Sequence, residues 1–255
     1  MRGWKETLLR VMDRKDHWAW PVFGGPNVTL GQLKKHFRQE FAVYVRDFPV
    51  FLGRIHSRCP VPEVRRDLAE NLYEEETGGL SGTGPHAELF LYMMEGLGYR
   101  RAEFVEIPLL PESRAYRAWL DEATLEHPWI VGAAVTTIFV EGSVHDRRDI
   151  SRPAGRPGFR EEALVDLARE NSLVRHHGLD PRYLELKRAH ARVEDSHRRS
   201  AWSIVLKHAR SAADRKRVLE ALEKSLDLWN RYRDGVARAA RIRMSPRQDR
   251  LRRTS

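Results

Sequence analysis

Cysteine is almost absent from this sequence of 255 residues. The single cysteine, Cys59, cannot form an intramolecular disulfide, and it excludes zinc or iron–sulfur sites that need several thiolates. Any metal site must therefore use histidine and carboxylate ligands. The shortage of cysteine also fits a reducing compartment, so we expect the protein in the cytoplasm.

Long apolar runs are lacking as well. The first 20 residues are charged throughout and do not contain the continuous apolar core of a signal peptide. The most apolar stretch, 129–140, is well short of the roughly 20 residues that cross a bilayer. We therefore expect neither a secretory leader nor a membrane partner.

Acidic residues are fewer than basic ones, which gives a formal net charge of +9. A positive charge can attract nucleic acid, but these basic residues are spread along the whole chain. Only the segment 241–253 is densely basic. We interpret 241–255 as a basic, disordered tail after one domain, 1–240, and we do not expect nucleic acid as a main partner.

Strand signals are nearly absent, whereas apolar residues recur every three or four positions, so we predict an all-α fold. Thr29 and Gln32 predict a capping box that opens a long helix ending near Cys59 and Pro60. The lengths of the remaining helices fit an antiparallel bundle. We expect those helices at 62–76, 85–97, 112–126, 128–145, 160–175, 181–210 and 212–240.

The strongest chemical signal lies between His190 and His197. With Glu194, these residues stand at helical positions i, i+4 and i+7 and therefore share one face. Helical bundles use the Glu-x-x-His spacing of Glu194 and His197 to hold iron or manganese. Taken by itself, this helix is explained equally well by a charged, solvated face.

Glu141 directly follows the most apolar run of the chain. An isolated carboxylate on a buried helix is costly unless it is protonated, paired or bound to a metal. This position therefore indicates a metal ligand. The alternative is a helix-end glutamate that already reaches water before Gly142.

Three consecutive glutamates end one predicted helix, and His86 begins the next. Glu75 best continues the apolar stripe of that helix, but Glu76 flanks the same stripe, so periodicity alone does not choose between them. A solvated acidic helix end and a surface histidine are the alternatives. Considered together, three carboxylates and three histidines on four helices suit two iron ions.

These segments resemble the haem-oxygenase-like di-iron oxidases and oxygenases, relatives of pyrroloquinoline-quinone synthase, of the thiaminase-like proteins and of the chlamydial death-domain-associating protein. The resemblance covers about residues 5 to 210. It is carried by the segments 44–49, 56–60, 71–75, 85–89, 139–142 and 190–197.

The resemblance implies a single haem-oxygenase-like bundle of about seven core helices. It also implies two ferrous ions, with manganese as a substitute, and O2 as co-substrate. The implied metal ligands, which are also the catalytic residues, are Glu75, His86, Glu141, His190, Glu194 and His197.

The sequence departs from relatives of this type in several features. A Gly-rich insertion lengthens the segment between Glu75 and His86, and Glu194 stands where aspartate is more common. Val140 and Leu186 occupy positions where the aminobenzoate synthases of this superfamily are expected to carry tyrosines. We therefore expect those enzymes to match poorly.

The implied activity is that of a non-haem di-iron, O2-activating oxidase or oxygenase. It would act on a small organic substrate, such as a fatty acid or an amino acid, by hydrogen abstraction or oxygen transfer. An external electron donor could be a further partner. The resemblance is also compatible with a homodimer. The alternatives are a metal-free helical binding or interaction protein and a cofactor-independent oxidase of the quinone-synthase type.

Two further residues are candidates for substrate or proton handling. Arg46 interrupts the apolar face of the long helix and could hold a substrate carboxylate. His145, one turn beyond Glu141, could act as a base beside the metal ligands. Both are explained equally well as surface residues. An apolar channel beside the ligands could be formed by Phe90, Met94, Val135 and Phe139.

Overall fold

The computed structural model describes residues 2–151, 166 and 169–244, without the side chains of residues 2 and 194–196. These residues form helices and no strand, which confirms the all-α prediction. Half of the predicted helix 160–175 and most of the predicted tail 241–255 lie outside the described residues. The division into a domain and a tail stays a prediction.

The described residues form α-helices together with short π-helical and 3-10 segments. In chain order they are α1 (Arg2–Met12), α2 (Trp20–Phe23), α3 (Leu30–Glu40), the π-helical η1 (Phe41–Val45), α4 (Phe48–Arg58), α5 (Pro62–Thr77), α6 (His86–Gly96), the 3-10 turn η2 (Arg101–Phe104), α7 (Pro111–Leu125), α8 (Trp129–Ala133), the π-helical η3 (Ala134–Val140), α9 (Asp146–Asp149), α11 (Ser172–His177), the 3-10 turn η4 (Pro181–Leu184), α12 (Glu185–His208) and α13 (Ala212–Ala239).

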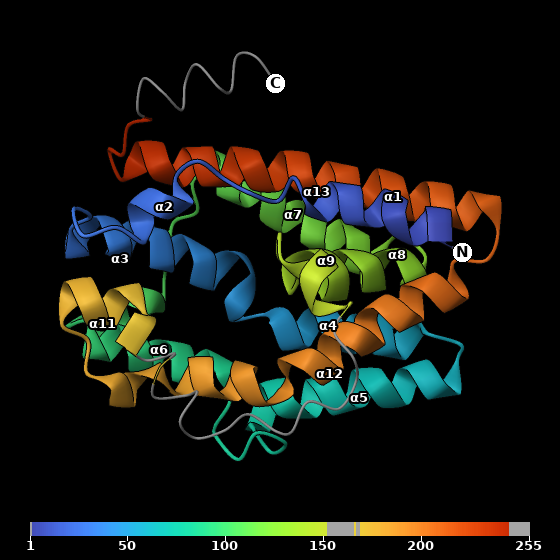
Figure 1. Ribbon diagram of the computed structural model, residues 1–255, viewed down its shortest axis with the longest axis horizontal. Helices are drawn as coiled ribbons and strands as arrows, with labels where there is room; N and C mark the ends of the chain where they lie inside the picture. Colours follow the sequence, from blue (N-terminus) through green and yellow to red (C-terminus); the bar gives the residue numbers. More distant parts are fainter. Residues whose placement is uncertain (1, 152–165, 167–168, 245–255) are drawn as a thin grey trace.

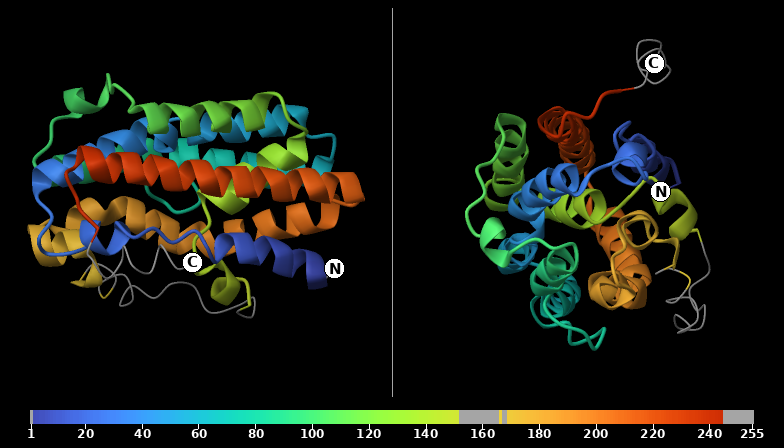
Figure 2. Two further views of the ribbon diagram at one scale, coloured as in Figure 1. Left: turned by 90° about the horizontal axis from the view of Figure 1, so that it is seen from above. Right: turned by 90° about the vertical axis from the view of Figure 1, so that its left-hand side faces the viewer.

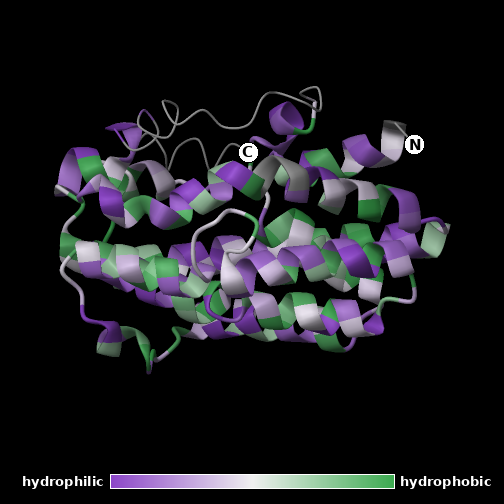
Figure 3. Cartoon of the chain, turned by 90° about the horizontal axis from the view of Figure 1, so that it is seen from below, coloured by the Kyte–Doolittle hydropathy of each residue, from purple (hydrophilic) through white to green (hydrophobic). Residues whose placement is uncertain are grey.

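The helices form an elongated bundle with three groups (Figure 1). α13, α1 and α7 lie on one side, α5, α6 and α12 lie on the other, and α4 and α8 run between them, as the end view also shows (Figure 2). Hydrophilic and hydrophobic residues alternate around most helices (Figure 3), because each helix buries only one face. The fold is the helical bundle that the periodicity predicts.

The predicted helix from Thr29 to Cys59 is interrupted. It begins with the expected capping box, in which the Gln32 amide donates to the Thr29 hydroxyl and the Thr29 amide donates to the Gln32 side chain. It then widens into η1 and breaks at Asp47, before α4 starts. Pro49 explains the break, since it has no amide proton and its ring clashes with the preceding turn of a continuous helix.

The segment formed by α8 and η3 is the central helix of the bundle. Its residues from Ile130 to Phe139 are all buried, and it packs against α4, α7, α12 and α13. At its end the Glu141 amide donates to the Thr136 carbonyl at 3.3 Å, the five-residue spacing of a π-helix. Single π-turns often mark functional sites, and this one places Glu141 at the end of the most buried segment.

Helix length and apolarity also limit how the chain can meet a bilayer. Among the described residues, no helix combines the length and the apolar character required to cross a membrane.

Candidate metal centre

Five of the six residues predicted as ligands line one cavity of about 90 Å³, which we call the metal cavity. Glu75 comes from α5, His86 from the start of α6, Glu141 from the end of η3, and His190 and His197 from α12. Ligand atoms of Glu75, His86 and His190 all lie within 4.8 Å of one another. Residues far apart in the sequence therefore converge as a metal centre requires.

Glu74 orients His86 through the ring nitrogen that is farther from Glu75. Its side chain is 0% exposed, and its Oε1 lies 3.1 Å from Nε2 of His86. Its Oε2 accepts hydrogen bonds from the backbone amides of Leu80 at 2.8 Å and Ser81 at 3.0 Å. Metal-binding histidines commonly donate their second ring nitrogen to such a carboxylate. Nδ1 is therefore the nitrogen that His86 presents toward Glu75.

The Gly-rich segment after α5 makes this support possible. Gly78 adopts a left-handed conformation with φ of 65°, and a Cβ there would lie 2.5 Å from the Gly84 carbonyl oxygen. The loop can therefore fold back on itself only with glycine at this position. This return brings the amides of Leu80 and Ser81 onto Glu74.

Two imidazole nitrogens in the metal cavity are buried without a hydrogen-bond partner. They are Nδ1 of His86 and Nε2 of His197. Nδ1 of His86 lies 3.0 Å from Oε1 of Glu75, but not in the direction of a hydrogen bond. Buried polar atoms are nearly always satisfied, and an unsatisfied imidazole nitrogen beside carboxylates and further histidines fits a divalent transition metal. The residues present thus fit iron.

The histidines differ in their protonation. Burial, together with the charges of Lys187 and the neighbouring imidazoles, lowers the pKa of His190 well below its usual value. Burial also lowers the pKa of His197 despite the attraction of nearby glutamates. For His86, burial is outweighed by Glu75 and Glu74, which raise its pKa. His190 and His197 are therefore held in the neutral form that binds metals.

Glu141 is fixed by an amide from α5. Nδ2 of Asn71 donates to Oε1 of Glu141 at 2.9 Å, and Asn71 is buried. This bond holds the carboxylate of Glu141 at the edge of the metal cavity. It joins α5 to the end of η3 at the site itself.

Sequence reasoning missed Glu74 and Asn71. The expected stripe ran through Val64, Leu68 and Leu72 to Glu75, but the buried positions of α5 are Val64, Leu68, Asn71 and Glu74. The signal was present, since 64, 68, 71 and 74 also follow helical spacing. A polar pair on an otherwise apolar stripe was the clue.

The structure separates the three consecutive glutamates by depth. Glu74 is fully buried, Glu75 lines the metal cavity, and Glu76 is exposed. Glu194 lies on α12 between His190 and His197, and its side chain lies outside the described residues. Its role stays a prediction.

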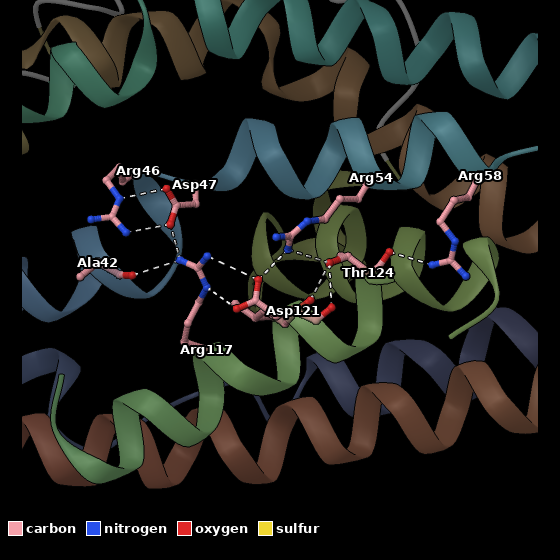
Figure 4. A network of polar contacts seen from close by, with 9 residues as sticks. Ala42, Arg46, Asp47, Arg54, Arg58, Arg117, Asp121 and Thr124 are labelled. Atoms are coloured by element: carbon pink, nitrogen blue, oxygen red, sulfur yellow. Dashed lines mark hydrogen bonds and ion pairs between the residues drawn. The ribbon is translucent and has the colours of Figure 1, made fainter. Parts of the chain in front are cut away.

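Arg46 lies in a different polar network. Its side chain is exposed, and its Nε and Nη2 each donate to the Asp47 carboxylate at 2.9 Å. Asp47 also accepts from Arg117, which pairs with Asp121, and Asp121 pairs with Arg54 (Figure 4). These ion pairs tie α4 to α7. The structure thus gives Arg46 a protein carboxylate as its partner.

Larger cavities adjoin the metal cavity. One of about 180 Å³ is lined by Tyr44, Phe48 and Leu186 as well as by Glu141 and His190. A second cavity, of about 380 Å³ and mainly apolar, shares Tyr44, Leu186 and His190 with it. An organic molecule could therefore reach the histidines without crossing the core.

Of the four residues predicted to line an apolar channel, one lines the apolar cavity and three belong to the core. Phe90 lines the apolar cavity, together with Met93. Met94, Val135 and Phe139 are fully buried core residues. His145 is exposed and lines a third neighbouring cavity rather than the metal cavity.

Solved structures share this architecture. A TenA homologue from Pseudomonas syringae pv. tomato superimposes with a TM-score of 0.67 and 14% identity, over 93% of this chain and 92% of that chain. A domain of unknown function with a heme oxygenase-like fold from Shewanella denitrificans gives a TM-score of 0.64 and 12% identity, over 94% and 91%. These likenesses confirm the predicted haem-oxygenase-like fold.

Curated relatives match a shorter segment. The 4-aminobenzoate synthase of Chlamydia pneumoniae is 31% identical over 77 residues, which cover 29% of this chain and 33% of that protein. The 4-aminobenzoate synthase of Chlamydia muridarum is 29% identical over 87 residues, 30% of this chain and 36% of that protein. The match thus spans about a third of the length of these relatives.

These matches correct one expectation. Val140 and Leu186 led us to expect that aminobenzoate synthases resemble this chain poorly, yet such enzymes are among its relatives over the matched segment. Both side chains do line the 180 Å³ cavity, together with Tyr44. The predicted difference from those enzymes, valine and leucine in place of tyrosines in this cavity, stays a prediction.

One family covers most of the chain. The family described as iron-containing redox enzymes matches residues 35–230, a range that includes each of the six predicted ligands and the central helix. The match agrees with the histidine and carboxylate chemistry of the metal cavity. This chain belongs to the family of iron-containing redox enzymes.

Proposed function

We propose that this protein is a non-haem di-iron, O2-activating oxidase or oxygenase that acts on a small organic substrate. The observation that carries the proposal is the convergence of Glu75, His86, Glu141, His190 and His197 on one cavity, with two imidazole nitrogens left without hydrogen-bond partners. The family supports iron, and mixed imidazole and carboxylate donors suit ferrous ions.

The chain's own residues would divide the work. Glu75, His86, Glu141, His190, His197 and, as a prediction, Glu194 would hold the metal, while Glu74 and Asn71 orient His86 and Glu141. When bound, ferrous iron supplies the redox chemistry that activates O2 for hydrogen abstraction from, or oxygen transfer to, the substrate. The buried surroundings exclude water, and an external electron donor would complete the reaction.

Anaerobic reconstitution with ferrous iron tests this proposal. We expect about two irons per chain, the number that the six ligands implied by the resemblance would hold. On mixing with O2 in a stopped-flow instrument, we expect a transient visible absorbance. Both signals should be lost in the Glu141→Ala, His190→Ala double variant.

The matched control is Glu76→Ala, which removes an exposed glutamate beside Glu75 and should keep both signals. One iron per chain would contradict the two-ion centre. No iron uptake by a folded protein would favour a metal-free binding protein or a cofactor-independent oxidase. Equal uptake by the double variant would place the iron elsewhere.

A further inference from the structure

The backbone around Glu141 lies at the end of the central helix. Because η3 ends at Val140, the carbonyl groups of its last turn lack the partners that a continuing helix would supply. Such carbonyl groups also form the negative end of the helix dipole. Whatever satisfies them fixes the backbone that carries the Glu141 carboxylate.

Lys15 supplies partners for these carbonyl groups. Its Nζ donates to the carbonyl oxygens of Phe139 at 2.5 Å, Val140 at 3.3 Å and Gly142 at 2.6 Å. It also lies 4.8 Å from the ring centroid of Phe139. A cation is favoured at this end of a helix by the dipole. All three N–H donors of one ammonium group are thus used on the backbone on both sides of Glu141.

The three acceptors favour the charged form of the amine. Burial lowers the pKa of Lys15 to about 7, and the charge of Asp146 opposes this effect. A neutral amine has two N–H donors, whereas an ammonium group has three. Three carbonyl oxygens around Nζ therefore match the ammonium form, which predominates below about pH 7.

The N-terminal segment packs closely on the same turn. A Cβ at Gly142 would lie 2.8 Å from Cε of Met12, the last residue of α1, and 2.6 Å from Oδ2 of Asp146. Asn71 of α5 donates to the Glu141 carboxylate at 2.9 Å. The N-terminal segment therefore contacts the backbone of the Glu141 turn, while α5 contacts its carboxylate.

The family match assigns no role to this segment, because Lys15 precedes the matched range 35–230. We infer that Lys15 is a positioning residue of the metal centre, whose ammonium group fixes the backbone on both sides of Glu141 and so holds this carboxylate at the metal cavity. The inference rests on the proposed function for the role of Glu141 as a metal ligand. The hold on the backbone can be tested without metal.

Chemical rescue of Lys15→Ala tests this inference. Lys15 lines the cavity of about 270 Å³ that also reaches the exposed residues Asp16 and His145, so a small amine can enter the vacated space. Propylammonium replaces the atoms of lysine beyond Cβ. The comparison compounds are 1-propanol, which has no charge, and propyltrimethylammonium, which has the charge but no N–H donor.

Two measurements follow the backbone and the metal separately. In metal-free Lys15→Ala at about pH 6.5, we expect amide hydrogen exchange of 136–146 to become about 10- to 100-fold faster, as the loss of hydrogen bonds from a charged group predicts. In anaerobic competition titrations with a chelator, we expect ferrous iron to bind about 10- to 100-fold more weakly. Propylammonium should reverse both changes, and neither comparison compound should reverse them.

Lys35→Ala is the matched control. Lys35 is exposed, and its Nζ donates to the carbonyl oxygen of Ala239 at 2.8 Å, at the end of α13. This variant also removes a lysine from a helix end, but Ala239 does not line the metal cavity. Exchange of 136–146 and iron affinity should both stay unchanged.

Lys15→Met separates the ammonium group from the space that it fills. Methionine keeps an apolar stem but has no N–H donor, so we expect faster exchange and weaker iron binding here too. Propylammonium should not rescue this variant, because the space is occupied. Lys15→Met also tests the ammonium group if Lys15→Ala fails to fold.

Three results would overturn the inference. They are unchanged iron affinity in the Lys15 variants, rescue by 1-propanol or propyltrimethylammonium as complete as that by propylammonium, and equal losses in Lys35→Ala. If the unaltered protein takes up no iron, the proposed function fails. Exchange in the metal-free protein then still decides whether Lys15 holds the turn, so the two failures are distinguishable.

Discussion

At the scale of single residues, Glu74 shows how the site depends on a side chain that need not touch a metal. It places one oxygen on His86 and the other on two backbone amides of the Gly-rich loop. Burial opposes the ionisation of Glu74, but hydrogen bonds from Ser81, His86 and Leu80 together hold its pKa below the usual value. It is therefore ionised at neutral pH and orients the imidazole.

We expect Glu74→Gln to weaken ferrous-iron binding about 10- to 100-fold, the usual effect of losing a carboxylate that supports a metal-binding histidine. The side-chain NH2 of the glutamine would also point toward groups that themselves donate hydrogen bonds, namely the Leu80 and Ser81 amides or His86. We expect this to cost about 1–3 kcal/mol of folding free energy. Metal competition titrations and urea unfolding would measure the two effects. Exposed Glu76→Gln is the control, and an equal loss in both variants would contradict the orienting role.

At the scale of elements, the metal cavity depends on irregular helical geometry. The π-helical η3 places Glu141 at the end of the central helix, and the return of the loop after α5 places two amides on Glu74. Single π-turns are concentrated at sites of function, and left-handed glycines allow a tight return of the backbone that other residues would resist. Here both adjoin the same cavity.

The two left-handed glycines of this loop allow a matched comparison. Gly78→Ala adds a Cβ that would lie 2.5 Å from the Gly84 carbonyl oxygen, whereas at Gly82, with φ of 68°, a Cβ meets no atom within 4 Å. Both changes cost about 1–2 kcal/mol of backbone strain, but only Gly78→Ala adds a backbone clash. We expect a larger loss of stability in Gly78→Ala, and weaker iron binding only there.

Thermal unfolding and metal competition titrations would check this comparison. Equal losses at Gly78 and Gly82 would mean that the close contact with Gly84 does not define the loop. Weak iron binding in Gly82→Ala would mean that any strain in the loop disturbs His86.

At the scale of the whole molecule, metal binding should stabilise the bundle, because ligands from α5, α6, η3 and α12 meet only in the folded state. At a free iron concentration about 100 times the dissociation constant, the gain is about 2.7 kcal/mol. We expect the Tm to rise by roughly 5–10 °C for a chain of this size. The Glu141→Ala, His190→Ala variant should show no rise, and an equal rise there would contradict this centre.

The sequence by itself determined the fold class and most of the proposed ligand set. Helical periodicity is a local property, so the spacing of His190 and His197 and the apolar run before Glu141 could be interpreted without a structure. The resemblance to a known family supplied the rest of the ligand set. Glu75 and His86 were predicted as ligands in this way despite the long glycine-rich segment between them.

Only the tertiary structure decided how these residues are supported and what lies beside them. The path of the glycine loop brings backbone amides to Glu74, and the rotation of α5 brings Asn71 to Glu141. A cavity of about 270 Å³ is lined both by Lys15, near one end of the chain, and by Arg233, near the other. Such contacts depend on packing between distant segments, which local spacing does not encode.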